Sequence, residues 1–172
     1  MKKIITIAIL SLPLFSFDYM ADCTVPNVLI KTVQLTENET TYPYLIRVNS
    51  QFEKFKNIVE RFTYKITDDK NVINCINQDN CIAITNTLIE NNVTNIDLGL
   101  HQINYYYYPK HTYRYFDRIE SFKSACEVIE DKIKYKKSWD WETLASYHSM
   151  TPHLNEIYKQ KLIKNYIKLT SK

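Results

Sequence analysis

The chain has 172 residues, a net charge of +3 at pH 7 and 45% hydrophobic residues, which suits a single domain with one core. This charge is far from the dense basic surface of a nucleic-acid-binding protein, so no nucleic-acid partner is expected. A mildly basic protein does suit an anionic polymer such as a cell wall.

The N-terminus has the features of a secretion signal. Residues 1–3 are a short basic start, and residues 4–15 form an apolar run that is too short to span a bilayer. We expect residues 1–16 to be a signal peptide and residues 17–172 to form the domain. No later run could span a bilayer, so the prediction is a periplasmic or secreted bacterial protein with no stable membrane span.

Apolar periodicity predicts the first helix of the mature chain over residues 24–36. Leu29, Ile30 and Val33 fall on one face, and Glu37 continues this face at the helix end. A carboxyl group at the end of an apolar stripe loses hydration, which favours its protonated form. That environment suits a glutamate that donates a proton near neutral pH. A solvated glutamate at a helix end is the alternative.

The next segments predict a small sheet with helices beside it. Strands are expected at 44–49 and 62–67, with a polar connector of helical spacing between them. A helix is expected over 82–91, capped by Asp79 or Asn80. A strand at 95–98 would complete the sheet.

The only glycine in the chain, Gly99, follows this last strand. Its retention in a glycine-poor sequence predicts a positive φ or a contact too close for a Cβ atom. Gln102 and Asn104 alternate with Ile103, and the aromatic run 105–108 follows. Amides can bind hydroxyl and N-acetyl groups, and aromatic rings can stack on sugar faces. The pattern therefore suits a sugar site, with a strand turn and an aromatic edge as the alternative.

The second half of the chain is predicted to be helical. Asp117 and Glu120 form a capping box before a helix that ends near residue 134, and Ser138 caps the next helix. Thr151 and Pro152 open the last helix, with proline in its first turn. The inner face of that helix is expected to consist of Leu154, Tyr158, Leu162, Tyr166 and Leu169.

Three segments together resemble lytic transglycosylases, the lysozyme-like enzymes that cut bacterial peptidoglycan. Residues 99–104, Gly-Leu-His-Gln-Ile-Asn, resemble the Gly-Leu-Met-Gln-Ile-Asn motif of that family. Residues 28–38 resemble the helix that ends in the catalytic Glu-Ser, and residues 144–149 resemble the helix that carries the active-site tyrosine. The order and spacing agree over about residues 23–166, which is more specific than any one motif.

The resemblance implies an α+β, lysozyme-like fold that is mostly helical, with a small antiparallel β-sheet and a glycan-binding groove. It implies cleavage of the MurNAc-β-1,4-GlcNAc bond with formation of 1,6-anhydro-MurNAc, with Glu37 as acid and then base. Tyr147 would orient Glu37 or support the charged intermediate. No metal or cofactor is implied. The residues expected to hold the glycan are Asn38, Gly99, Leu100, Gln102 and Asn104.

The sequence departs from this family at two motif positions and leaves other functions open. Asn38 stands where many members have serine, and His101 where many have methionine. One alternative is a goose-type muramidase, a hydrolase in which Asp97 positions a water molecule. The other is a non-catalytic, wall-binding component of a secretion apparatus. The expected partners are peptidoglycan strands, with a secretion or conjugation apparatus as a further candidate.

The chain has four cysteines, and an even number after a secretion signal suggests disulfides. Cys75 and Cys81 are close in sequence and flank a turn, so we pair them, which leaves Cys23 with Cys126. Free buried thiols are the alternative. A cysteine nucleophile is disfavoured because no cysteine lies in a motif that resembles a thiol-hydrolase site.

Overall fold

The computed structural model describes residues 23–39 and 41–171, so the expected signal peptide, residues 1–16, lies outside the described residues. Helices and a small antiparallel sheet form an α+β fold, which confirms the predicted class. In chain order the elements are α1 (Asn27–Glu37), β1 (Leu45–Val48), α2 (Phe52–Val59), β2 (Lys65–Ile66), β3 (Val72–Asn74), α3 (Gln78–Glu90), β4 (Ile96–Leu98), β5 (Ile103–Asn104), α4 (Tyr113–Phe116), α5 (Arg118–Lys136), α6 (Trp141–Ala145) and α7 (Pro152–Thr170).

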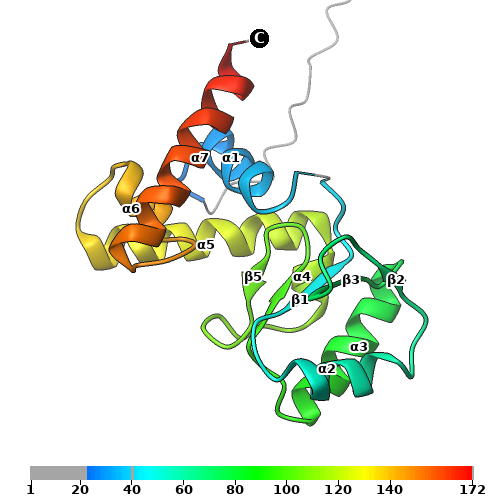
Figure 1. The fold of residues 1–172 in the computed structure, drawn as a ribbon. Helices are drawn as coiled ribbons and strands as arrows, with labels where there is room; N and C mark the ends of the chain where they lie inside the picture. The colour runs from blue at the N-terminus through cyan, green and yellow to red at the C-terminus, as the bar shows by residue number, and fades with distance from the viewer. Residues whose placement is uncertain (1–22, 40, 172) are drawn as a thin grey trace, which may run out of the picture.

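The elements are arranged in two parts. Figure 1 shows α1, α5, α6 and α7 gathered on one side of the molecule, and the sheet with α2 and α3 on the other. Helix α7 packs against both α1 and α6, and α5 also contacts α1 and α6. The short helix α4 packs against α5 and α3 and so links the two parts.

The sheet has the strand order β2-β3-β1-β4-β5, and all neighbours are antiparallel. Ile46 on the central strand pairs with Ile73 on one side and Leu98 on the other. At the edge, Asp97 pairs with Asn104. The strand expected at 62–67 is limited to β2. Strands β3 and β5 were not predicted, because two or three residues are too few to show an alternating pattern.

Two helices begin at caps that differ from the predicted ones. The Asn77 side chain accepts a hydrogen bond from the backbone of Asn80 and caps α3, so the expected caps lie inside the helix. Asp140, and not Ser138, caps α6 by accepting a bond from Thr143 N. In both cases a capping side chain lay within three residues of the predicted one, and only the backbone geometry decided between them.

The other helix starts follow the sequence more closely. The Asp117 side chain caps α5 as expected, but Glu120 binds Arg114 and Lys123 and does not complete the capping box. Helix α7 begins at Pro152 after its cap Thr151. Both assignments depend on local chemistry, in which a carboxylate accepts free N–H groups and proline tolerates the first helical turn.

The inner face of α7 is only partly the predicted one. Tyr158 and Leu162 are buried, whereas Leu154 is 41% and Leu169 37% exposed, because these two lie near the ends of the helix. Asn155 is buried instead, and its amide donates to the carbonyl oxygens of residues 142 and 149. This polar residue ties α7 to α6 and to the turn that joins the two helices.

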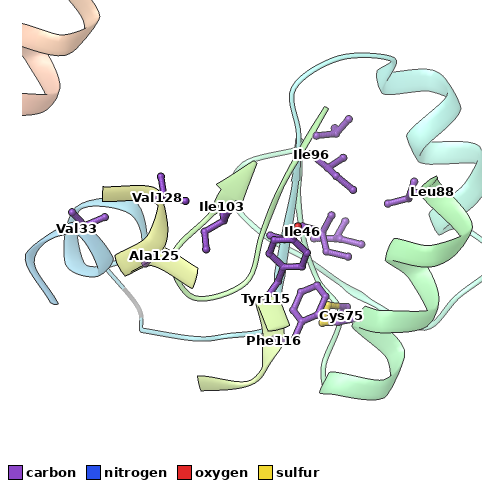
Figure 2. Packing of buried hydrophobic residues seen from close by; sticks show 14 of the residues in the cluster. Val33, Ile46, Cys75, Leu88, Ile96, Ile103, Tyr115, Phe116, Ala125 and Val128 are labelled. Atoms are coloured by element: carbon purple, nitrogen blue, oxygen red, sulfur yellow. A yellow bond between two sulfur atoms is a disulfide. The ribbon is translucent and has the colours of Figure 1, made fainter. Parts of the chain in front are cut away.

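The centre of the core is built around α4, which the sequence did not predict. Tyr115 and Phe116 are fully buried, and Figure 2 shows them beside Ile46 of β1 and Cys75. The Tyr115 hydroxyl donates to the carbonyl oxygen of Tyr108 at 2.6 Å. A four-residue helix has no readable period, so only tertiary packing identifies it.

Both expected disulfides are present. The Cys23–Cys126 bridge joins the segment before α1 to α5, and the Cys75–Cys81 bridge joins the end of β3 to α3. All four cysteines are thereby paired, which excludes free thiols and a cysteine nucleophile in this oxidised form. Within the described part of the chain, no helix is both long and apolar enough to cross a bilayer.

The two bridges are expected to differ in their effect on stability. A Cys23→Ala/Cys126→Ala variant should lose about 3–5 kcal/mol of unfolding free energy, because a long loop is released in the unfolded chain. The matched Cys75→Ala/Cys81→Ala variant releases a loop with a sequence separation of only 6 and should lose less. Urea unfolding without reductant measures both. A larger loss for the short loop would contradict the loop-entropy explanation.

Candidate functional site

A cleft of about 630 Å³ lies where the end of α1, the β4–β5 edge of the sheet, α5 and the α6–α7 turn meet. These segments are far apart in the sequence, and the packing of both α1 and α6 on α7 brings the end of α1 close to the α6–α7 turn. The predicted catalytic and glycan-binding residues that line it, with Asp97 from the hydrolase alternative, are Glu37, Asp97, Gln102, Asn104 and Tyr147.

Glu37 is the last residue of α1, and its side chain is only 13% exposed although it lines an open cleft. The last turn of α1 is held against α7 by a hydrogen bond from Asn165 Nδ2 to Thr36 Oγ1 at 3.0 Å. Glu37 Oε1 lies 3.4 Å from His148 Nδ1. The carboxyl group is therefore partly desolvated, held on a rigid helix and next to one titratable base.

Tyr147 is fixed by a hydrogen bond from its hydroxyl to the carbonyl oxygen of His101 at 2.8 Å. Burial, with the charges of Glu37 and Asp97, holds the pKa of Tyr147 well above its usual range, so the hydroxyl stays protonated. The His101 ring is itself fully buried, with Nδ1 2.8 Å from Ser121 Oγ. Burial lowers the pKa of the His101 imidazole to about 3, so the residue whose carbonyl group holds Tyr147 carries no charge.

Two residues beside Glu37 were not assigned to the site from the sequence. The His148 ring stacks on Tyr158 of α7, with ring centroids 4.7 Å apart and an angle of 7° between the planes. Tyr158 is 4% exposed, and its hydroxyl makes no hydrogen bond of standard geometry within the described residues. Burial raises the pKa of the Tyr158 hydroxyl, and the charge of Glu37 adds to this rise. The Tyr158 hydroxyl and the Glu37 carboxyl group therefore interact. The available sequence signal was the position of His148 directly after Tyr147.

The side chains of Asp97 on β4 and Asn104 on β5 form a hydrogen-bonded pair. Asn104 Nδ2 donates to Asp97 Oδ1 at 2.7 Å and to Asn95 Oδ1 at 2.9 Å. Burial is the main cause of the raised pKa of Asp97; the Glu37 charge adds to it, whereas bonds from Asn49 and Asn104 oppose it. Asn104 Oδ1 also accepts a bond from the Tyr106 backbone. The Asn104 amide therefore already holds Asp97 and the turn after β5.

Gln102 lies in the turn directly before β5, with a positive φ of 47°. Its Nε2 atom donates to the carbonyl oxygen of Gly99 at 2.7 Å, which closes the turn between β4 and β5. Within the described part of the chain, its Oε1 atom has no hydrogen-bond partner. Of the two predicted amides, Gln102 therefore has the more available acceptor.

Three of the expected glycan contacts do not line the cleft. Asn38 is buried, and its Nδ2 atom donates to the carbonyl oxygen of Tyr42. Leu100 is also buried and lies in the turn before β5. Gly99 has a φ of +73°, and an added Cβ would lie 1.8 Å from the carbonyl oxygen of Tyr115. Both predicted reasons for this glycine are confirmed, but the group that approaches it belongs to the chain itself.

The tyrosine run after β5 divides between the cleft and the core. Tyr107 and Tyr108 line the cleft, and Tyr107 is 71% exposed. Tyr105 packs edge-on against Tyr115 and belongs to the core. The Tyr108 hydroxyl donates to Asp131 of α5. The cleft therefore has an exposed aromatic rim next to two charged residues of α5, Asp131 and Lys132, which have no signal in the sequence.

The chain matches no protein-family model, no curated protein and no solved structure. Among the described residues, the potential metal ligands that lie together are Cys23, Cys126 and Glu130. The two sulfur atoms form a disulfide, and Glu130 accepts bonds from Thr24, so this group does not offer thiolates to a metal ion. The cleft around Glu37 is therefore the candidate functional site among the described residues.

Proposed function

We propose that the chain is a lytic transglycosylase with a lysozyme-like fold, which cleaves the MurNAc-β-1,4-GlcNAc bond of peptidoglycan. The observation that carries this proposal is Glu37, a carboxyl group that is 13% exposed inside an open cleft of about 630 Å³. An open cleft suits a polymer, and a partly desolvated glutamate suits a general acid. An exposed tyrosine at the rim offers a stacking surface for a sugar ring.

In the proposed reaction, Glu37 gives its proton to the glycosidic oxygen as the bond to C1 breaks through an oxocarbenium-like state. The Glu37 carboxylate then takes the proton of the sugar's own 6-hydroxyl, whose oxygen bonds to C1 and closes the 1,6-anhydro ring. Glu37 ends in its starting form, and no water is consumed. Because the Tyr147 hydroxyl donates to His101, its oxygen lone pairs remain available to stabilise the positive sugar ring.

A goose-type muramidase is the second candidate, because Asp97 lines the same cleft and is close enough for the Glu37 charge to affect its pKa. In that reaction Asp97 would position the attacking water. A non-catalytic wall-binding protein has less support. It would be favoured by a Glu37 that is exposed and distant from Tyr147, whereas Glu37 is mostly buried and its charge reaches Tyr147.

The product distinguishes the two enzymes. Mass spectrometry of muropeptides that the purified protein releases is expected to show 1,6-anhydro-MurNAc ends, because a single carboxylate uses the sugar's own hydroxyl. Asp97→Asn keeps the size of the side chain and should leave the anhydro product unchanged. Reducing MurNAc ends that disappear in Asp97→Asn would assign the protein to the hydrolases instead, and the absence of any released muropeptide would end the enzymatic proposal.

We also propose export to the periplasm or beyond. The two disulfides are compatible with an oxidising compartment, where such bridges persist. N-terminal sequencing of the protein recovered from the periplasm should find residues 1–16 removed. An intact N-terminus on cytoplasmic protein would contradict export.

A further inference from the structure

We propose that His148 is a positioning residue that shares one proton with Glu37 and keeps this carboxyl group ready to act as an acid at neutral pH. The catalytic meaning of this inference rests on the proposed function. The shared proton itself can be tested without any turnover.

The geometry places the two groups as a pair. His148 Nδ1 lies 3.4 Å from Glu37 Oε1, and both side chains line the cleft. One face of the imidazole ring is covered by the Tyr158 ring at 4.7 Å, with an angle of 7° between the planes. The His148 backbone N–H donates to the carbonyl oxygen of Ala145. The imidazole is therefore fixed by the stack, the backbone and the carboxylate, while its side chain remains 49% exposed to the cleft.

The charges around His148 come from four segments of the fold. Glu37 at the end of α1 raises the pKa of His148 through a hydrogen bond, and Asp97 of β4 adds to this rise; burial and Lys161 of α7 oppose it. Tyr158 of α7 and Tyr147 after α6 stay protonated, because burial holds their pKa values well above the usual range. The acidic groups therefore outweigh the cation, and the pair retains a proton at a higher pH than an isolated imidazole does.

When His148 and Glu37 share one proton, the pair has two forms that differ only in which side chain carries that proton. In the first form, His148 is an imidazolium and Glu37 a carboxylate; in the second, His148 is neutral and Glu37 a carboxylic acid. Water in the cleft stabilises the separated charges of the first form. A glycan strand that displaces this water favours the second form, because separated charges lose their solvation. The proton then moves from Nδ1 to Oε1, and no other group gains or loses one.

This exchange fits both halves of the proposed reaction. Glu37 receives the proton from His148, passes it to the glycosidic oxygen and later regains one from the 6-hydroxyl. His148 stays neutral from bond cleavage to ring closure and makes no contact with the reacting atoms. When the product leaves and water returns, the ionic form is restored.

The pH profile of muropeptide release tests the catalytic part. In wild type the alkaline limb of kcat/KM should reflect the pair and lie above the ordinary imidazole value of about 6.5. In His148→Gln this limb should move toward acid, because the imidazole that retains the proton at neutral pH is gone, with turnover retained on the acid side. A residue that only supports the fold would lower the rate at every pH without moving this limb. An unmoved limb therefore overturns the inference.

His153 provides the matched control, because it is an exposed histidine in the first turn of α7. His153→Gln makes the same chemical change outside the residues that line the cleft. Its pH profile should match that of wild type. An equal shift in both variants would overturn the specific role of His148.

Proton NMR titration of the histidine Cε1–H signals tests the shared proton without turnover. The His148 signal, assigned by its loss in His148→Gln, should titrate above the ordinary imidazole range in wild type and at a lower pH in Glu37→Gln. If the midpoint of the His148 titration is the same in Glu37→Gln as in wild type, His148 and Glu37 share no proton and the inference is overturned. If wild type releases no muropeptides, the proposed function fails by itself. The midpoint of the His148 NMR titration then decides whether His148 and Glu37 share a proton. A lower midpoint in Glu37→Gln supports the shared proton, and an unchanged midpoint contradicts it.

Discussion

Replacing Glu37 with glutamine is expected to lower the rate of peptidoglycan cleavage by about 100- to 10,000-fold, the contribution that a general acid typically makes. Glutamine keeps the shape of the side chain, so the cleft and the end of α1 should be retained. It removes the proton that the leaving sugar oxygen needs. Turnover of purified peptidoglycan, followed by mass spectrometry of the released muropeptides, measures this change. Pelleting with insoluble peptidoglycan should show binding similar to that of wild type.

Glu39 provides the matched control for this substitution. It lies two positions further along the chain, is exposed, and does not line the cleft. Glu39→Gln makes the same change in charge and should leave the cleavage rate close to that of wild type. Full activity in Glu37→Gln would remove Glu37 from the mechanism, and equal losses in both variants would point to a general charge effect.

Replacing Gly99 with valine is expected to destabilise the whole fold. The new Cβ would lie 1.8 Å from the carbonyl oxygen of Tyr115, and Gly99 has a φ of +73° that branched residues avoid. Overpacking and backbone strain together predict a loss of about 2–5 kcal/mol, a large share of the stability of an ordinary domain. Urea unfolding followed by circular dichroism measures this loss.

Asn92 separates the two causes of this loss. It is exposed and has a similar φ of 59°, but it already carries a Cβ atom. Asn92→Val therefore introduces backbone strain without the collision and should lose only about 1–2 kcal/mol. If Gly99→Val unfolds at the same urea concentration as wild type and loses only activity, the glycine serves the cleft and not the packing of Tyr115.

Local physical chemistry explains what the sequence determined by itself. A 3.6-residue apolar period located α1 and placed Glu37 at its end, because this period requires no distant contact. The lone glycine indicated a positive φ at residue 99, since few other residues adopt that backbone conformation. The proline at the start of α7 and the aspartate that caps α5 act on the nearest N–H groups. The disulfide pairing followed from the even count and the short separation of Cys75 and Cys81.

Tertiary packing decided the features that have no local signal. Elements of two to four residues, such as β3, β5 and α4, are too short for a period, and their conformation is set by pairing and burial. The sequence also could not tell which polar residues of a motif face the cleft. Asn38 points into the structure and bonds to the Tyr42 carbonyl, and the Asn104 amide holds Asp97, because neighbouring buried groups require these bonds.

The arrangement around Glu37 depends most strongly on the tertiary structure. His148 and Tyr158 lie more than a hundred positions away in the chain and reach the carboxyl group only because α7 packs against both α1 and α6. The sequence predicted that a glutamate would end a helix on its apolar face, and it left open whether that glutamate would be solvated. Whether that glutamate would face solvent, another carboxylate or an imidazole was decided by which helices meet, because electrostatic interactions depend on distance in space and not on separation along the chain.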